Sequence, residues 1–217
     1  MSFPHTANVA VHVTFGTLCL ILGVIALIAT KGGRRHIRAG RYFLACLAVV
    51  IATAVIGIVA FGFRAFLGVI TLLAAYEAYS GYRALKIRLT GPQLQDAVVS
   101  VGGIGTTMLF IAYLRSVHVP WAPVVIYSTL GSLVVIAGYD LVRLTFPKKW
   151  FQTTWIYEHL VKMLGAYNAV VSAFSGTVLE KWQPYSQIAP SILGVAAILG
   201  FSICAWRHPR AFAIPAA

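Results

Sequence analysis

The segment NVAVHVTFGTLCLILGVIALIAT (residues 8–30), followed directly by KGGRRHIRAGR (residues 31–41), decides the fold class of this chain. A bilayer core about 30 Å thick requires about 20 helical residues, and this apolar stretch is long enough to cross it. Six similar stretches follow, at 42–63, 65–85, 96–115, 121–144, 154–178 and 188–206. Because an open sheet leaves backbone groups unpaired in lipid, the pattern predicts an all-α membrane bundle of seven transmembrane helices. We expect one domain, residues 1–217.

The composition excludes an ordinary soluble protein. Of 217 residues, 59% are hydrophobic and only 10% are charged, whereas soluble domains carry about 25% charged residues. The net charge is +12, but the basic residues stand in short connections between apolar stretches. We therefore expect membrane lipids as partners and no nucleic acid. The three cysteines, Cys19, Cys46 and Cys204, lie in apolar stretches and are predicted to be buried and unpaired.

Lysine and arginine are divided unequally between the two sides of the predicted bundle. Thirteen fall on one side: Lys31, Arg34, Arg35, Arg38, Arg41, Arg83, Lys86, Arg88, Arg143, Lys148, Lys149, Arg207 and Arg210. Three fall on the other, Arg64, Arg115 and Lys181, and Lys162 lies within a helix. Because short basic loops stay in the cytoplasm, the N-terminus is predicted to lie outside and the C-terminus inside, in an inner or plasma membrane.

Small residues predict which helices are central. Gly102, Gly103 and Gly105 stand near the start of the fourth stretch, and Gly165, Ala169, Ser172 and Gly176 share one face of the sixth. Helices in lipid approach one another closely where such residues meet. A ligand packed against bare backbone is the alternative interpretation.

Glu77 is the ionisable residue that most needs an explanation. Eight residues separate it from Leu85 at the predicted cytoplasmic end, which places it about 12 Å deep at 1.5 Å per residue. An ionisable group at a helix centre costs about 2.5–3.5 kcal/mol, so a carboxyl at this depth must be protonated or paired. Tyr76 and Tyr79 are deep enough to be its hydrogen-bond partners.

Three other segments bring further ionisable groups to the same end of the bundle, namely His36, Asp140, Glu158, His159 and Lys162. Structural roles are open for each of them. Asp140 and Arg143 are spaced for a helical ion pair, and Lys162 is spaced to pair with Glu158 while its amine reaches the interface. His36 lies in a predicted loop that faces lipid phosphates. His159 is equally consistent with a structural hydrogen bond.

Three functions are consistent with this polar group. The first is a small proton-linked carrier of an unknown small molecule or the proton itself, in which Glu77 and His159 exchange a proton. The second is a membrane enzyme that binds a single zinc or iron through His36, His159, Asp140 and Glu77. The third is a non-catalytic assembly or receptor-like subunit. The oligomeric state, including a homo-oligomer, is left open.

Three passages carry a resemblance: Gly16 to Leu27 with the following KGGRRHIRAGRYF (31–43), SGYRAL (80–85) and EHLVKMLGAY (158–167). Together they resemble an uncharacterised family of bacterial multipass membrane proteins, known as a domain of unknown function. The resemblance implies a bacterial inner membrane and marks His12, His36, Ser80 to Tyr82 and His159 as family features. It implies no activity.

Better-known seven-helix families fit poorly. The last stretch lacks the lysine of microbial rhodopsins, and no pair of histidines four apart stands in it, as seven-helix zinc hydrolases require. A haem held by two histidines requires both at one depth. His12 and His159 are predicted near opposite ends of their helices, about 20 Å apart by helix rise, so they do not share one haem.

Overall fold

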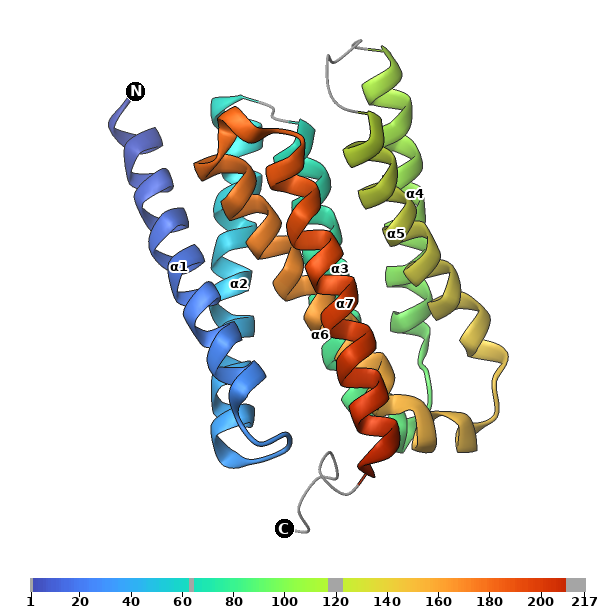
Figure 1. Ribbon diagram of the computed structural model, residues 1–217. Helices are drawn as coiled ribbons and strands as arrows, with labels where there is room; N and C mark the ends of the chain where they lie inside the picture. Colours follow the sequence, from blue (N-terminus) through green and yellow to red (C-terminus); the bar gives the residue numbers. More distant parts are fainter. Residues whose placement is uncertain (1, 63–64, 117–122, 210–217) are drawn as a thin grey trace. The chain divides into compact units, whose positions relative to one another are not determined.

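The computed structural model describes residues 2–62, 65–116 and 123–209. In these ranges the chain forms seven α-helices, two short 3-10 helices and no strand, which confirms the all-α prediction (Figure 1). The α-helices are α1 (Phe3–Ile28), α2 (Arg34–Phe61), α3 (Ala65–Thr90), α4 (Leu94–Ser116), α5 (Pro123–Val142), α6 (Lys148–Val178) and α7 (Tyr185–Arg207). The 3-10 helices are η1 (Arg143–Thr145) and η2 (Glu180–Trp182). Arg64 and Arg210, counted for orientation, lie outside the described residues.

Five helices begin earlier than predicted, α2 and α6 by the largest margins. The predicted loop 31–41 is helical from Arg34, so His36 stands in the first turn of α2 and not in a loop. The predicted turn 146–153 is likewise helical from Lys148. Arginine and lysine are good helix formers, and Pro147 is well tolerated at a helix start, where no N–H is required. Hydropathy alone marks the apolar part of each helix and misses these charged first turns.

Five helices are long and apolar enough to cross a membrane: α1, α2, α4, α5 with η1, and α7. The chain is therefore a multipass membrane protein by the length and composition of these helices. Among the described residues, α3 and α6 do not reach the same apolarity because charged side chains interrupt them. Four of those charged side chains, Glu77, Arg83, Glu158 and Lys162, are buried within the protein.

The structure divides into two compact units, and the predicted organisation as one domain stays a prediction. The first unit comprises Met1–Arg64 and Ile192–Ala217, with α1, α2 and most of α7. The second comprises Ala65–Ser191, with α3 to α6 and the first turns of α7.

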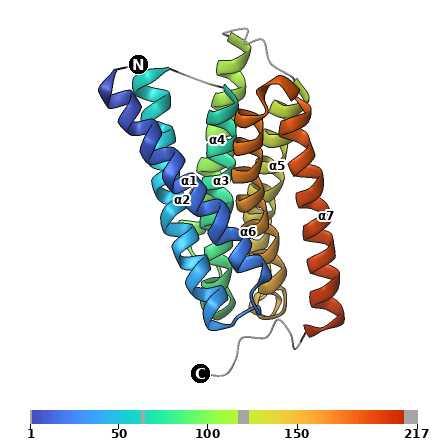
Figure 2. The same cartoon turned by 60° about the vertical axis from the view of Figure 1, so that its left-hand side comes forward.

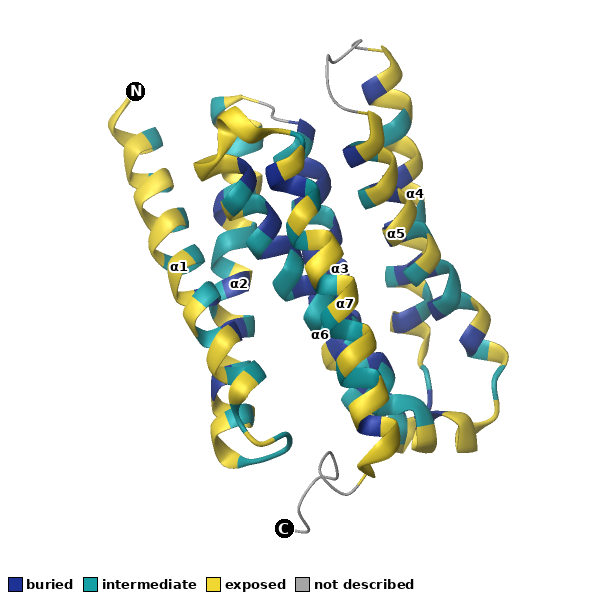
Figure 3. Cartoon of the chain, viewed as in Figure 1, coloured by how far each residue is buried: buried dark blue, intermediate teal, exposed yellow. Residues whose placement is uncertain are grey.

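In the first unit α1 and α2 run antiparallel, side by side (Figures 1 and 2). His12 Nδ1 lies 2.9 Å from Thr53 Oγ1, and His36 Nδ1 donates to the Ala26 carbonyl at 2.9 Å. Figure 3 shows α1 exposed along most of its length, and its exposed side chains include many valines, leucines and isoleucines. Such a surface suits lipid. Cys19 is buried as predicted, whereas Cys204 is exposed, so that prediction was wrong for Cys204.

In the second unit α3 is the central helix. It contacts α6 most extensively and also touches α4 and α5. One apolar cluster joins α3 to α5 and consists of Leu73, Tyr76, Leu133 and Ala137. A second joins α3 to α6 and consists of Ile70, Ala74 and Ala169. Helix α3 is thus covered by protein on at least two sides, which explains why it tolerates polar residues.

Glycine permits the closest contacts, as the sequence predicted in part. A Cβ added at Gly103 of α4 would lie 3.0 Å from the Tyr76 ring, and one at Gly165 of α6 would lie 2.6 Å from Glu77 Cδ. Gly102 and Gly105 have nothing within 4 Å. Close packing is therefore confirmed at Gly103 and Gly165, while the other two glycines of α4 do not contribute to it.

Candidate functional site

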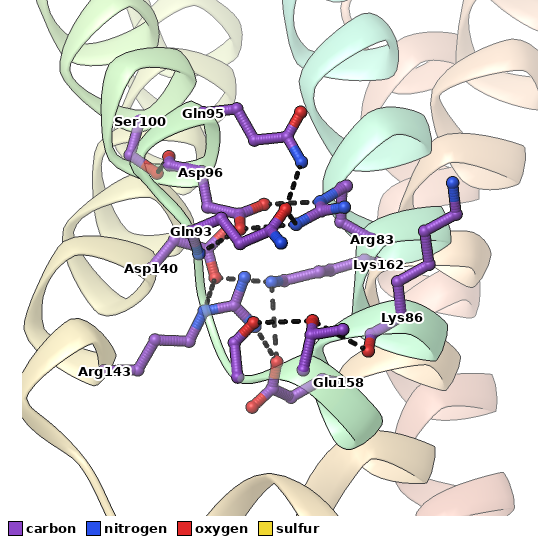
Figure 4. A network of polar contacts seen from close by, with 12 residues as sticks. Arg83, Lys86, Gln93, Gln95, Asp96, Ser100, Asp140, Arg143, Glu158 and Lys162 are labelled. Carbon is purple, nitrogen blue, oxygen red and sulfur yellow. Dashed lines mark hydrogen bonds and ion pairs between the residues drawn. The ribbon is translucent and has the colours of Figure 1, made fainter. Parts of the chain in front are cut away.

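A buried group of four charged side chains lies where α5, η1 and α6 meet, and we call it the ionic cluster: Asp140, Arg143, Glu158 and Lys162 (Figure 4). Each of the four is 7% exposed or less. Two carboxylates face two cations, so the cluster is neutral as a whole. Such balance is needed because an unpaired charge that is removed from water costs several kcal/mol, by order of magnitude.

The contacts show how the charge is shared. Arg143 Nε lies 3.0 Å from Asp140 Oδ1, and Arg143 Nη1 pairs with Glu158 Oε2. Lys162 Nζ lies 2.5 Å from Asp140 Oδ1 and 3.9 Å from Glu158 Oε2. The predicted Asp140–Arg143 pair is confirmed. The prediction that Lys162 reaches the interface was wrong, because Lys162 is only 2% exposed and its closer partner is Asp140 on another helix.

Two tyrosines complete the hydrogen bonds of the cluster. The Tyr76 hydroxyl donates to Asp140 Oδ2 at 2.9 Å and lies 2.9 Å from Ser100 Oγ on α4. The Tyr139 hydroxyl donates to Glu158 Oε1 at 2.8 Å. Tyr76 was predicted as a partner for Glu77, and that was wrong, because successive helical residues point about 100° apart and only Tyr76 faces α4 and α5.

A second buried ion pair joins α3 to α4 beside the ionic cluster. Arg83 Nε lies 2.7 Å from Asp96 Oδ1, and Arg83 Nη2 donates to Asp96 Oδ2 at 2.7 Å (Figure 4). The same carboxylate accepts the backbone N–H of Gln93 at 2.8 Å. Sequence reasoning counted Arg83 only as a loop cation and missed this pair. The sequence did contain a signal for this pair, because Asp96 stands in the first turn of α4, directly after the basic end of α3.

Glu77 differs from every acid described above. It is 4% exposed, it forms no ion pair with a described residue, and its Oε2 atom has no hydrogen-bond partner among them. Its carboxyl lies against the bare backbone of Gly165, where an added Cβ would approach both oxygens. One turn along α3, Ser80 is also buried, and its Oγ has no described partner. The α3–α6 contact thus contains a buried carboxyl with no ion-pair partner among the described residues, one turn from the buried hydroxyl of Ser80.

His159 lies on the same face of α6, nearer the ionic cluster. Its Nδ1 atom donates to the Gly81 carbonyl at 2.9 Å, because a carbonyl oxygen only accepts. Gly81 stands one turn after Glu77 on α3. His159 and Glu77 therefore both face the α3–α6 contact. A structural role for His159 in joining the two helices agrees with this bond.

The predicted metal ligands are divided between separate environments. Asp140 is paired with Arg143 and Lys162, His159 binds a backbone carbonyl, and His36 belongs to the other unit. Within the described ranges, no three His, Cys, Asp or Glu side chains are grouped so that they could hold a metal ion. The zinc or iron site built from these residues and Glu77 has no geometric support.

No protein-family model, curated protein or solved structure matches the chain. The resemblance to a bacterial membrane family therefore stays a prediction, and function must be argued from the site.

Proposed function

We propose that this protein is a small proton-linked carrier in which Glu77 binds and releases the proton. One observation carries the proposal: of the five acids in the chain, Glu77 is buried without a cation or a hydrogen-bond donor on Oε2. Asp96, Asp140 and Glu158 are each held by buried cations. A paired carboxylate resists protonation, whereas an isolated one changes its charge when its surroundings change.

The surroundings support this role. The ionic cluster is neutral without Glu77, so an ionised Glu77 adds an uncompensated negative charge close to it. Isolated ionisable groups at membrane depth are costly and typically mark proton or ion pathways. His159, one turn toward the cluster, carries an imidazole that can accept and release a proton, and we assign it the exchange of protons with the cytoplasmic side.

Glu77→Gln tests the proposal. In liposomes that contain purified protein and a trapped pH dye, we expect proton flux in the wild type and none above protein-free liposomes in the variant. Glu180→Gln is the matched control, because Glu180 is exposed and undergoes the same chemical change. We expect Glu77→Gln to fold normally, since removal of a buried unpaired carboxyl is neutral or stabilising. Equal flux in Glu77→Gln and the wild type would contradict the proposal and favour the non-catalytic subunit.

A second readout does not depend on a flux measurement. Hydrophobic carbodiimides modify carboxyls that carry a proton in apolar surroundings. We expect mass spectrometry to locate the modification at Glu77 and not at Glu158, which is held by Arg143. Modification of Glu158 alone would remove Glu77 from the site.

We also propose that all seven helices span the inner or plasma membrane, with the ionic cluster toward the cytoplasm. The unequal distribution of basic residues supports this orientation. Arg35 and Lys181 are both exposed and lie on opposite predicted sides. With the exposed Cys204 replaced by serine, we expect Arg35→Cys to resist an impermeant thiol reagent in intact cells and Lys181→Cys to react. The reverse pattern would place the cluster outside.

A further inference from the structure

Helices α3 and α6 run antiparallel in a fixed register. A Cβ added at Gly81 would meet Met163 Sδ at 3.0 Å, Gly165 faces the Glu77 carboxyl, and one added at Gly176 would meet Phe66 at 3.2 Å. The three contacts order the helix pair from the ionic cluster, past Glu77, to its opposite end. These contacts show which residues of α3 lie opposite a given residue of α6 along the helix axis.

A second buried polar group lies at that opposite end. Ser172, Ser186 and Gln187 are 1%, 7% and 3% exposed, and Ser172 Oγ, Ser186 Oγ and Gln187 Oε1 have no described hydrogen-bond partner. Ser175 Oγ lies 2.7 Å from the Ser186 carbonyl, so the first turns of α7 are attached to the last turns of α6. Gln187 packs against Gly176, where an added Cβ would lie 2.7 Å from Gln187 Cγ. We call these three side chains the distal polar site.

The chemistry of the distal polar site defines its ligand. Buried polar atoms nearly always have a hydrogen-bond partner, so three such oxygens where the end of α6 meets the start of α7 favour a hydrogen-bonding ligand there. The amide oxygen of Gln187 only accepts, and the two hydroxyls both donate and accept. None of the three side chains is charged. This set fits water molecules and the hydronium ion, whose O–H groups donate to neutral oxygens.

An apolar layer separates this site from Glu77. Ser172 lies seven residues beyond Gly165 on α6, a distance of about 10.5 Å along the helix. Between these levels α3 and α6 meet through Ala74 and Ala169, which form one buried cluster with Ile70. Phe66, which meets Gly176, packs against this cluster from the distal end. The side chains of Ile70, Ala74 and Ala169 have no polar atom that could carry a proton.

We propose that the distal polar site binds water and hydronium, and that the layer of Ile70, Ala74 and Ala169 seals it from Glu77. The proposal rests on the proposed function and assigns the second end of the proton path. When the layer opens, the hydronium ion gives its proton to the Glu77 carboxylate and leaves as water. While it is closed, Glu77 exchanges protons only toward the ionic cluster.

Ala74→Ser tests the seal, because it adds one hydroxyl in the middle of the layer with little change in volume. We expect passive proton entry into liposomes to rise about two- to tenfold, the effect of one hydrogen bond on a rate. Ala137→Ser is the matched control, since Ala137 is fully buried but lies in the α3–α5 cluster. Ala169→Ser places the same hydroxyl on α6 and serves if Ala74→Ser does not fold.

Two double variants define the path. We expect the added leak to disappear in Ala74→Ser with Glu77→Gln, and in Ala74→Ser with Gln187→Leu. Equal leak in Ala74→Ser and Ala137→Ser, with wild-type flux still dependent on Glu77, would overturn the seal and leave the proposed function standing. A leak that survives Gln187→Leu would overturn the distal polar site. Equal proton flux in the wild type and in Glu77→Gln would overturn the proposed function itself.

Discussion

Replacement of Arg143 by methionine is expected to destabilise the protein by about 3–5 kcal/mol, the cost of removing one partner from a buried ion pair. Arg143 is 1% exposed and pairs with both Asp140 and Glu158. Its loss leaves two buried carboxylates with Lys162 alone. Chemical unfolding of purified protein in detergent micelles, followed by circular dichroism, measures the loss.

Two further variants separate charge from packing. Arg35→Met is the matched control, because Arg35 is exposed on α2, and we expect its stability to stay within about 0.5 kcal/mol of the wild type. Arg143→Met combined with Glu158→Leu leaves Asp140 with Lys162, and we expect this double variant to recover most of the loss. An Arg143→Met protein as stable as the Arg35→Met control would show that the cluster does not contribute to folding.

The second large effect is that of Gly165→Ala on the stability of the protein. Its sign depends on whether residue 77 carries a carboxyl. In the wild type, Gly165→Ala places a methyl group against the Glu77 carboxyl, and overpacking of this kind costs about 1–3 kcal/mol. In a Glu77→Ala background the same methyl group enters the space that the carboxyl left. There we expect Gly165→Ala to stabilise the protein by up to about 1 kcal/mol, the helix preference of alanine over glycine.

Thermal unfolding of the four proteins in the cycle measures this reversal. Gly138→Ala in α5 is the matched control, since a Cβ at Gly138 meets nothing within 4 Å. We expect the control change to have the same effect in both backgrounds. Equal effects of Gly165→Ala in the two backgrounds would mean that the Glu77 carboxyl does not lie against the backbone of Gly165.

The helices and the burial of Glu77 could be predicted from sequence because both depend on local properties. Apolar length marks most of the helices, and an acid well inside such a stretch must be enclosed by protein. The Asp140–Arg143 pair was predictable for the same reason, since both partners lie within one turn. Gly165 was also identified in advance, because a small residue on a membrane helix marks close approach.

The partners that come from different helices could not be predicted in this way. Lys162 has an acid four residues earlier, yet its shorter contact is with Asp140 on α5. Arg83 finds Asp96, and Tyr76 turns toward Asp140 rather than Glu77. Such pairs depend on which helices meet and on how each is rotated about its axis. A single sequence with no matched relative contains little information on either.

The ion pairs also bear on how the chain enters the membrane during synthesis. Helices α3 and α6 are too polar to favour lipid alone, yet their buried charges other than Glu77 have ion-pair partners on the neighbouring α4 or on α5 with η1. Arg83 on α3 can pair with Asp96 as soon as α4 has been synthesised, and Asp140 and Arg143 can pair with Glu158 and Lys162 as soon as α6 has been synthesised. These ion pairs can therefore form one after another during synthesis. Insertion as successive helical hairpins would spare the translocation machinery from holding several unpaired charges at once.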